Sequence, residues 1–64
     1  MSISLKAARV NAKLTQAEAA KELNIARGTL ASYESYKTKP DIDTGKKIAA
    51  LYKTDMDKIS WNGC

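Results

Sequence analysis

The side chains of this 64-residue chain offer few routes to chemistry. Histidine, the side chain that most often moves protons near neutral pH, is absent, and the single cysteine is Cys64, the last residue. Carboxylates, lysines, tyrosines and hydroxyls remain, in a chain too short to wall a substrate pocket away from water. We therefore expect no enzymatic activity and no small-molecule substrate.

The same composition argues against bound metals and cofactors. Without histidine the usual zinc ligand sets cannot be assembled, and one cysteine cannot close an internal disulfide. The chain also contains no apolar run near the ~18 residues of a membrane span, and it does not begin with a secretion signal. We expect a cytoplasmic protein without cofactor, metal or membrane contact.

Charge is distributed unevenly along the chain. The net charge is +4, and residues 41–64 balance four lysines with four aspartates, so the whole excess lies in the first forty residues. Such asymmetry suits contact of one side of the molecule with a polyanion, although a basic composition is also common among small proteins that bind nothing acidic. Those forty residues hold three glutamates against Lys6, Arg9, Lys13, Lys21, Arg27, Lys37 and Lys39.

Helical periodicity and capping signals divide the chain into short helices. Ser4 and Thr15 stand where helices could begin, and Thr15 with Glu18 forms a capping-box pattern. Asn24 marks a sharp turn, because asparagine tolerates the left-handed conformation, and Pro40 breaks the helical pattern. No stretch alternates with period two, so we expect no β-structure. The expected class is all-α, with five helices at about 4–12, 16–23, 26–35, from Asp41 or Asp43 to near Lys53, and from Thr54 onward.

The segment 15–35 has the spacing of two helices that cross at a tight turn. Helices joined by three or four residues cross steeply, so their contact point needs a small side chain, which Ala20 supplies. Leu23 and Ile25 flank the turn, while Leu30 and Tyr33 attach the second helix to the body. The other positions of that helix are left to meet something outside. The residues that fit a helix-turn-helix spacing are Ala19, Ala20, Leu23, Asn24, Ile25, Leu30 and Tyr33.

With these residues the chain resembles the lambda-repressor-like (Cro/CI-type, XRE) helix-turn-helix family of phage and bacterial transcriptional regulators, over about residues 3–60. The resemblance implies a compact five-helix domain at 1–60 with a tail at 61–64, its second and third helices forming the motif. It also implies a regulator, most often a repressor, that binds double-stranded DNA as a homodimer on a pseudo-palindromic operator. The motifs are Leu14-Thr15-Gln16, Ala20, Leu23-Asn24-Ile25, Leu30, Tyr33-Glu34, Lys37-Thr38-Lys39-Pro40 and Ile48-Ala49.

Base contacts are what the resemblance implies for the second helix of the motif, which enters the major groove in this family. Arg27 is the best candidate to read a base, because a guanidinium can bond bidentately to O6 and N7 of guanine. Gly28 occupies a base-facing position without a side chain, so either the backbone approaches closely or that base step is not read directly. Thr29 and Ser32 can reach bases or phosphates with modest selectivity.

Phosphate contacts are implied at two other places. Gln16 begins the first helix of the motif, where free backbone N–H groups can hold a phosphate. Lys37 and Lys39 follow the second helix and fit the family's second phosphate-binding loop. The alternatives are that Lys37 and Lys39 lie in a solvated loop and that Gln16 is only a residue that favours helix. Tyr36 stands where the family usually has glycine, so the loop follows another path or Tyr36 faces the DNA backbone.

Arg9 and Glu34 occupy positions that several family members join by a buried ion pair, with a direct phosphate contact of Arg9 as the alternative.

Met56, Ile59 and Trp61 lie at the end of the chain where such proteins usually associate, and we expect the dimer contact there, although Trp61 could instead cap the core.

Other interpretations remain open from the sequence. Gly45 stands where an apolar residue is expected, which indicates lower stability or close contact with a partner. The chain is either a minimal Cro-like regulator or the DNA-binding part of a longer repressor. A protein-binding module of the same fold, such as an antitoxin or adaptor, is the alternative function.

Overall fold

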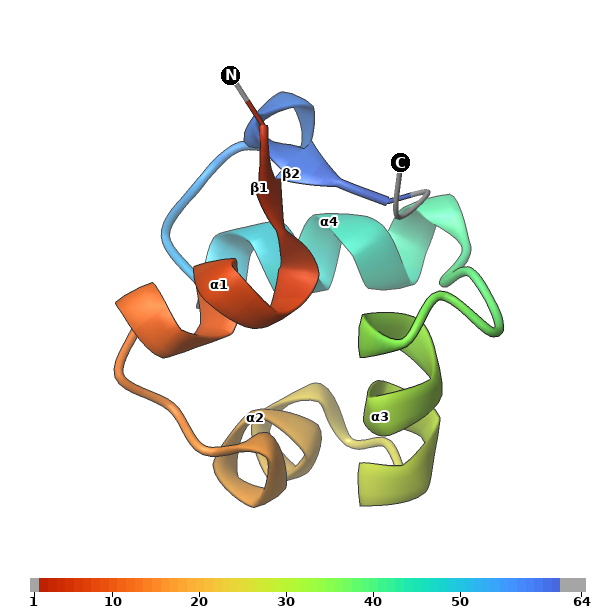
Figure 1. The fold of residues 1–64 in the computed structure, drawn as a ribbon. Helices are drawn as coiled ribbons and strands as arrows, with labels where there is room; N and C mark the ends of the chain where they lie inside the picture. The colour runs from red at the N-terminus through yellow and green to blue at the C-terminus, as the bar shows by residue number, and fades with distance from the viewer. Residues whose placement is uncertain (1, 62–64) are drawn as a thin grey trace.

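The fold is known from a computed structural model, which describes residues 2–61 and packs four α-helices around one apolar core (Figure 1). The helices α2 and α3 lie on one side of α4, and the two short strands lie on the other. Within residues 2–61 no helix has the length and apolar character needed to cross a membrane. The elements in chain order are β1 (Ile3–Ser4), α1 (Leu5–Asn11), α2 (Gln16–Leu23), α3 (Arg27–Glu34), α4 (Ile42–Leu51), the 3₁₀ turn η1 (Met56–Lys58) and β2 (Ile59–Ser60).

Three of the four helices begin at a side chain that caps free N–H groups. The hydroxyl of Ser4 accepts an N–H from the first turn of α1, at 3.0 Å. The hydroxyl of Thr15 accepts the N–H of Glu18, whose carboxylate accepts the N–H of Thr15 in return, so the predicted capping box is confirmed. This N–H of Thr15 lowers the pKa of Glu18 below its usual value. Asp41 caps α4 by accepting the N–H of Thr44 at 2.8 Å, which lowers the pKa of Asp41.

All four helices end on the same backbone motif, and none of them uses glycine for it. After each helix one residue has a positive φ of 55–62°, and these residues are Lys13, Asn24, Tyr36 and Lys53. The N–H of each donates to the carbonyl three residues earlier, and the N–H of the next residue donates to the carbonyl five residues earlier, at 2.9–3.3 Å. This is the hydrogen-bond pattern of the Schellman motif. Asn24 confirms the predicted turn, whereas lysine and tyrosine adopt this conformation at a cost of about 1–2 kcal/mol.

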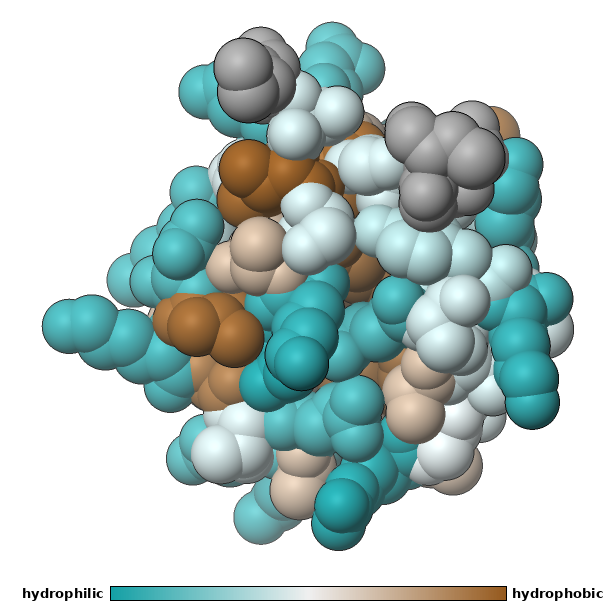
Figure 2. Space-filling model, viewed as in Figure 1, coloured by the Kyte–Doolittle hydropathy of each residue, from teal (hydrophilic) through white to brown (hydrophobic). Residues whose placement is uncertain are grey.

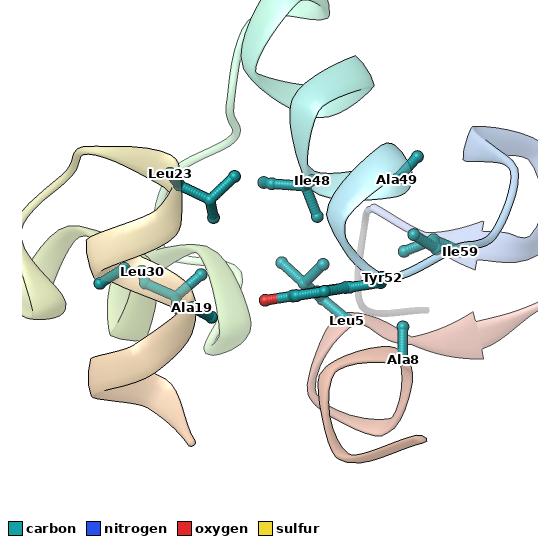
Figure 3. Packing of buried hydrophobic residues seen from close by; sticks show 10 residues of the cluster. Leu5, Ala8, Ala19, Leu23, Leu30, Ile48, Ala49, Tyr52 and Ile59 are labelled. Atoms are coloured by element: carbon teal, nitrogen blue, oxygen red, sulfur yellow. The ribbon is translucent and has the colours of Figure 1, made fainter. Parts of the chain in front are cut away.

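The core lies where α1, α2, α3 and α4 meet (Figure 3). Leu5, Leu30 and Ile48 are its largest fully buried side chains, and they come from three different helices. Ala19 and Ala20 of α2 are 0% and 3% exposed. Their small size lets α2 pack closely against its neighbours, as the spacing around Ala20 predicted.

The end of the chain departs from the all-α prediction. The expected fifth helix is only the three-residue turn η1, and the side chain of Asp55 before it makes no capping hydrogen bond. The chain then runs extended because Ile59 pairs with Ile3, and Ser60 with Ser4, in a parallel two-residue ladder. A pairing this short between distant segments leaves no alternating pattern in the sequence, which is why β-structure was not expected.

Gly45 allows the chain end to pack against α4. A Cβ placed on Gly45 would lie 2.9 Å from Cε of Met56 and 3.9 Å from the ring of Trp61. The sequence left open lower stability or a close contact with a partner at this glycine, whereas the close contact in the structure is with side chains of the same chain. The indole N–H of Trp61 donates to the carbonyl of Met56 at 2.9 Å, so Trp61 belongs to the packed structure rather than to a tail. The rest of the predicted tail, residues 62–64 with Cys64, lies outside the described residues.

The left-handed helix ends predict that Lys53→Gly stabilises the fold. Glycine adopts a positive φ without the steric cost that lysine bears, although it also increases the entropy of the unfolded chain. We expect the free energy of unfolding in urea to rise by about 0.5–1 kcal/mol. The control is Ala50→Gly, an exposed site inside α4 where glycine should cost about 1 kcal/mol. Equal destabilisation by both variants would contradict the assignment.

Candidate nucleic-acid interface

The helix α3 is held to the body from one side only. Leu30 is fully buried and Tyr33 packs against the core, whereas Arg27 and Gly28 are exposed and Thr29 and Ser32 are half-buried. In Figure 1 this helix forms an edge of the molecule, and Figure 2 shows mostly pale, near-neutral surface over it. The structure thus brings the four predicted base-contact residues onto one short helix at the surface.

The first turn of α3 has open backbone as well as open side-chain positions. Ala26 precedes the helix and offers no side-chain acceptor, and the first bond along the helix is from the N–H of Leu30 to the carbonyl of Ala26. A Cβ added at Gly28 would have no heavy atom within 4 Å. Nothing in the chain's own packing therefore requires glycine here, and the backbone at this point is accessible to a partner.

Three cations surround this surface without acidic partners. Arg27, Lys37 and Lys39 are exposed, and none of them has a carboxylate within 4.0 Å among the described residues. The lysines lie in the loop between α3 and α4, which leaves the C-terminal end of α3 on the same edge of the molecule (Figure 1). These positive charges are free to meet an anion.

Tyr36 does not lie where a phosphate contact would need it. Its backbone does take the left-handed path that the family's glycine would take, at φ 62°. Its half-buried side chain, however, turns inward, and the hydroxyl accepts the N–H of Leu5 at 3.3 Å and donates to the carbonyl of Ser60 at 3.1 Å. The prediction that Tyr36 contacts DNA phosphate is therefore wrong, because the hydroxyl is already engaged inside the molecule.

Arg9 and Glu34 form a buried, bidentate ion pair between α1 and α3. Nε of Arg9 lies 2.7 Å from one carboxylate oxygen of Glu34, and a second guanidinium nitrogen lies 3.4 Å from the other. The third nitrogen donates to the carbonyl of Leu14 at 2.8 Å. Their side chains are 10% and 6% exposed, so Arg9 is not placed to hold a phosphate directly. The structure thus joins the two residues for which the sequence predicted this pair.

Gln16 is connected to the same ion pair. Its amide nitrogen donates to the carboxylate of Glu34 at 3.1 Å, which fixes the half-buried side chain at the start of α2. An amide nitrogen has two N–H donors, so the second remains for another acceptor. Gln16 therefore keeps the capacity for the predicted phosphate contact while also taking part in the internal network.

Tyr52 brings a buried hydroxyl close to this network. The residue is 5% exposed, and its hydroxyl points into the core toward α2 (Figure 3). It is the buried side-chain oxygen without a hydrogen-bond partner in the part of the chain that the structure describes. Burial, and next the negative charge of Glu34, raise the pKa of Tyr52 to about 12. No sequence signal pointed to a buried, unpaired hydroxyl at this position.

The residues predicted for a dimer contact have different surroundings. Ile59 is 3% exposed and pairs with Ile3, so the prediction that it meets a second chain is wrong. Met56 and Trp61 are half-buried and pack against the core. A further apolar residue at the surface is Ile42, which is 69% exposed at the start of α4 and one turn ahead of Gly45, the residue against which Met56 and Trp61 pack. Its position on the buried stripe of α4 gave no signal of this exposure.

An open hollow of about 440 Å³ lies between the C-terminal ends of α1 and α4, away from α3. Its wall includes Lys13 and Lys53 but no carboxylate.

Among residues 2–61 no group of three cysteine or acidic side chains is arranged to hold a metal ion.

Comparison with known proteins identifies relatives. A family model described as helix-turn-helix matches residues 5–59. The HTH-type transcriptional regulator ImmR of Bacillus subtilis (strain 168) is 45% identical over 55 residues, which are 86% of this chain and 43% of the relative. The chain therefore spans less than half the length of this relative. No solved structure matches the chain significantly.

The buried ion pair predicts a large effect of Arg9→Ala on stability. The substitution leaves the carboxylate of Glu34 buried without its cation, which in general costs about 3–5 kcal/mol. We expect a large drop in the melting temperature measured without DNA. The control is Lys58→Ala, which removes an exposed ion pair with Asp55 at 3.8 Å and should change stability by less than about 1 kcal/mol. Similar melting temperatures for the two variants would refute the structural role of Arg9.

The unpartnered hydroxyl predicts that Tyr52→Phe is neutral or stabilising at pH 7, because it removes a buried polar group that bonds to nothing. The raised pKa also sets a pH dependence. The folded state holds the Tyr52 proton more tightly than the unfolded chain, in which the pKa of tyrosine is 10. The stability that this tighter binding of the proton contributes is therefore complete below pH 10 and is lost as the pH rises toward 12. Wild type should lose about 2–3 kcal/mol relative to Tyr52→Phe over this interval in urea unfolding. Parallel pH profiles for the two proteins would disprove the shift.

Proposed function

This chain belongs to the helix-turn-helix family, and from that premise we propose that it is a sequence-specific DNA-binding regulator of transcription that acts as a repressor. The XRE-type resemblance seen in its motifs is confirmed by the match over residues 5–59. The observation that carries the proposal is the outer side of α3, where Arg27 is exposed and without an acidic partner among the described residues.

Base reading is assigned to the first half of α3. The helix lies with its N-terminal residues in the major groove, where Arg27 donates two hydrogen bonds to a guanine. The open position at Gly28 supports a close approach of the helix backbone to the base edges or the adjacent phosphate. Thr29 and Ser32 contribute hydroxyl contacts farther along the same helix.

Phosphate binding is assigned to both sides of α3. Gln16 donates its remaining amide N–H and lies at the start of α2, where backbone N–H groups favour an anion. Lys37 and Lys39 neutralise phosphates on the other side. Contacts of this kind fix the register of the protein on the duplex and make the affinity depend on salt.

Dimerisation follows from the size of the reading surface. One such helix reads only half of a typical operator, and two-fold dimers of this fold bind half-sites roughly 34 Å apart. The exposed Ile42 and the outer surface of Trp61 supply neighbouring apolar groups for a contact with a second chain. The bound dimer represses by occupying the promoter.

Arg27→Ala and Lys37→Ala should weaken DNA binding in different ways. Loss of a base-reading guanidinium should remove about 1–3 kcal/mol of discrimination at one base pair. Loss of a phosphate-binding lysine should weaken all sequences alike and lower the slope of log affinity against log salt by about 0.9. The measurement is a gel-shift titration against a duplex selected from a random pool, its single-base variants and a random duplex, with the stoichiometry of the complex recorded.

Two outcomes would contradict the proposal at different levels. If both substitutions reduce binding to every duplex by one common factor, Arg27 does not read a base. If the wild-type protein binds no duplex even at low salt, the DNA-binding function fails, and a protein-docking role for the exposed side of α3 takes its place.

A further inference from the structure

Tyr36 links three segments that are far apart in the chain. Its hydroxyl accepts the N–H of Leu5, at the start of α1, and donates to the carbonyl of Ser60 in β2. An N–H at the start of a helix has no partner within its own helix, so this hydroxyl satisfies a group that would otherwise be unpaired. The hydroxyl therefore bridges the residue after β1 and the last residue of β2, so it adds a further link between these two segments from the turn that follows α3.

The same residue sets the path of the loop that carries Lys37 and Lys39. The N–H of Tyr36 donates to the carbonyl of Tyr33, and the N–H of Lys37 donates to the carbonyl of Ser32. The chain leaves α3 through the left-handed backbone of Tyr36, where φ is 62°. The direction of the loop thus depends on one residue whose side chain is fixed to the start of α1 and to β2.

The left-handed backbone of Tyr36 has a steric cost, which the interactions of its side chain can offset. Glycine adopts a positive φ freely, whereas a bulky residue bears a steric cost there. Lys13 and Lys53 bear the same cost at the ends of α1 and α4, but their side chains are exposed. Only at Tyr36 do the hydrogen bonds of the described side chains tie the left-handed residue to two distant segments.

We propose that Tyr36 is a positioning residue for the phosphate-binding loop, and that its hydroxyl holds Lys37 and Lys39 in place by fixing the end of α3 to the paired ends of the chain. The proposal rests on the proposed DNA-binding function for its consequence, but its structural part does not need DNA. Formation of the β1–β2 pairing and the placement of the loop are then one coupled event.

The test compares Tyr36→Phe with Tyr52→Phe. Tyr36→Phe keeps the ring and the left-handed backbone but removes both hydrogen bonds. Tyr52→Phe removes a hydroxyl that has no partner among the described residues. Amide hydrogen exchange of Leu5 and Lys37, whose N–H groups donate to the hydroxyl of Tyr36 and to the carbonyl of Ser32, is measured by NMR without DNA. The salt dependence of binding is then measured on the selected and random duplexes. Both are done at a temperature where each variant remains folded.

In Tyr36→Phe we expect both amides to exchange about tenfold faster, because Leu5 loses its acceptor and the turn that holds the N–H of Lys37 loosens. Tenfold is the factor for the loss of one hydrogen bond. We expect the salt slope to fall by up to about 0.9 for each phosphate that is no longer neutralised, with an unchanged ratio of selected to random binding. Tyr52→Phe should alter neither measurement. A folded Tyr36→Phe variant with unchanged exchange at Lys37 overturns the proposal, and so does faster exchange with an unchanged salt slope.

Failure of the proposed function gives a different pattern. If the wild-type protein binds no duplex, the assignment to DNA binding fails, while the exchange rates still decide whether the hydroxyl of Tyr36 fixes the loop. A third variant, Tyr36→Gly, separates the backbone from the side chain. It removes the strain as Lys53→Gly does, and it also removes the ring. A loop that exchanges faster only in Tyr36→Gly and not in Tyr36→Phe therefore assigns the effect to the ring or the backbone and overturns the role of the hydroxyl.

Discussion

The ion pair between Arg9 and Glu34 is the interaction on which the arrangement of the helices depends. It joins α1 to α3 at 2.7 Å, and its hydrogen bonds extend to Gln16 at the start of α2 and to the carbonyl of Leu14 before it. Burial withdraws both charges from water, so they are tolerable only with their partners in place. Burial of apolar side chains is not directional, so the charged network adds to the core a set of contacts with fixed geometry between α1, α2 and α3.

The ends of the helices show how a short chain builds four tight turns without glycine. Each turn is closed by the same pair of backbone hydrogen bonds around a left-handed residue, and lysine, asparagine and tyrosine take that position. Glycine is used elsewhere. At Gly45 it allows Met56 and Trp61 to cover α4, and at Gly28 it leaves an open position on the outer side of α3. The backbone strain at the turns is therefore accepted, and of these two glycines only Gly45 lies in close contact with other side chains.

The buried side and the exposed side of α3 have separate roles. Leu30 and Glu34 hold the helix to the body, while Arg27 and the loop lysines extend outward without acidic partners among the described residues. Gln16 and Tyr36 are the connections between the two sides. One binds Glu34 from the start of α2, and the other fixes the end of α3 to β1 and β2. A rigid interior thus determines how the polar groups of the outer side are presented.

The sequence by itself determined the local structure: the capping box at Thr15 and the left-handed Asn24 follow from interactions within a few residues. The spacing around Ala20 indicated a close contact of α2 with its neighbours, and the base-contact residues around Arg27 stay a prediction from the resemblance. The sequence also indicated the Arg9–Glu34 pair, through its resemblance to a family. Tertiary structure alone decided the pairing of Ile3 with Ile59, the inward hydroxyl of Tyr36 and the exposure of Ile42, of which helical periodicity gave no sign. The physical reason is that each of these depends on two segments meeting from distant parts of the chain, and no spacing within one segment records where the other will lie.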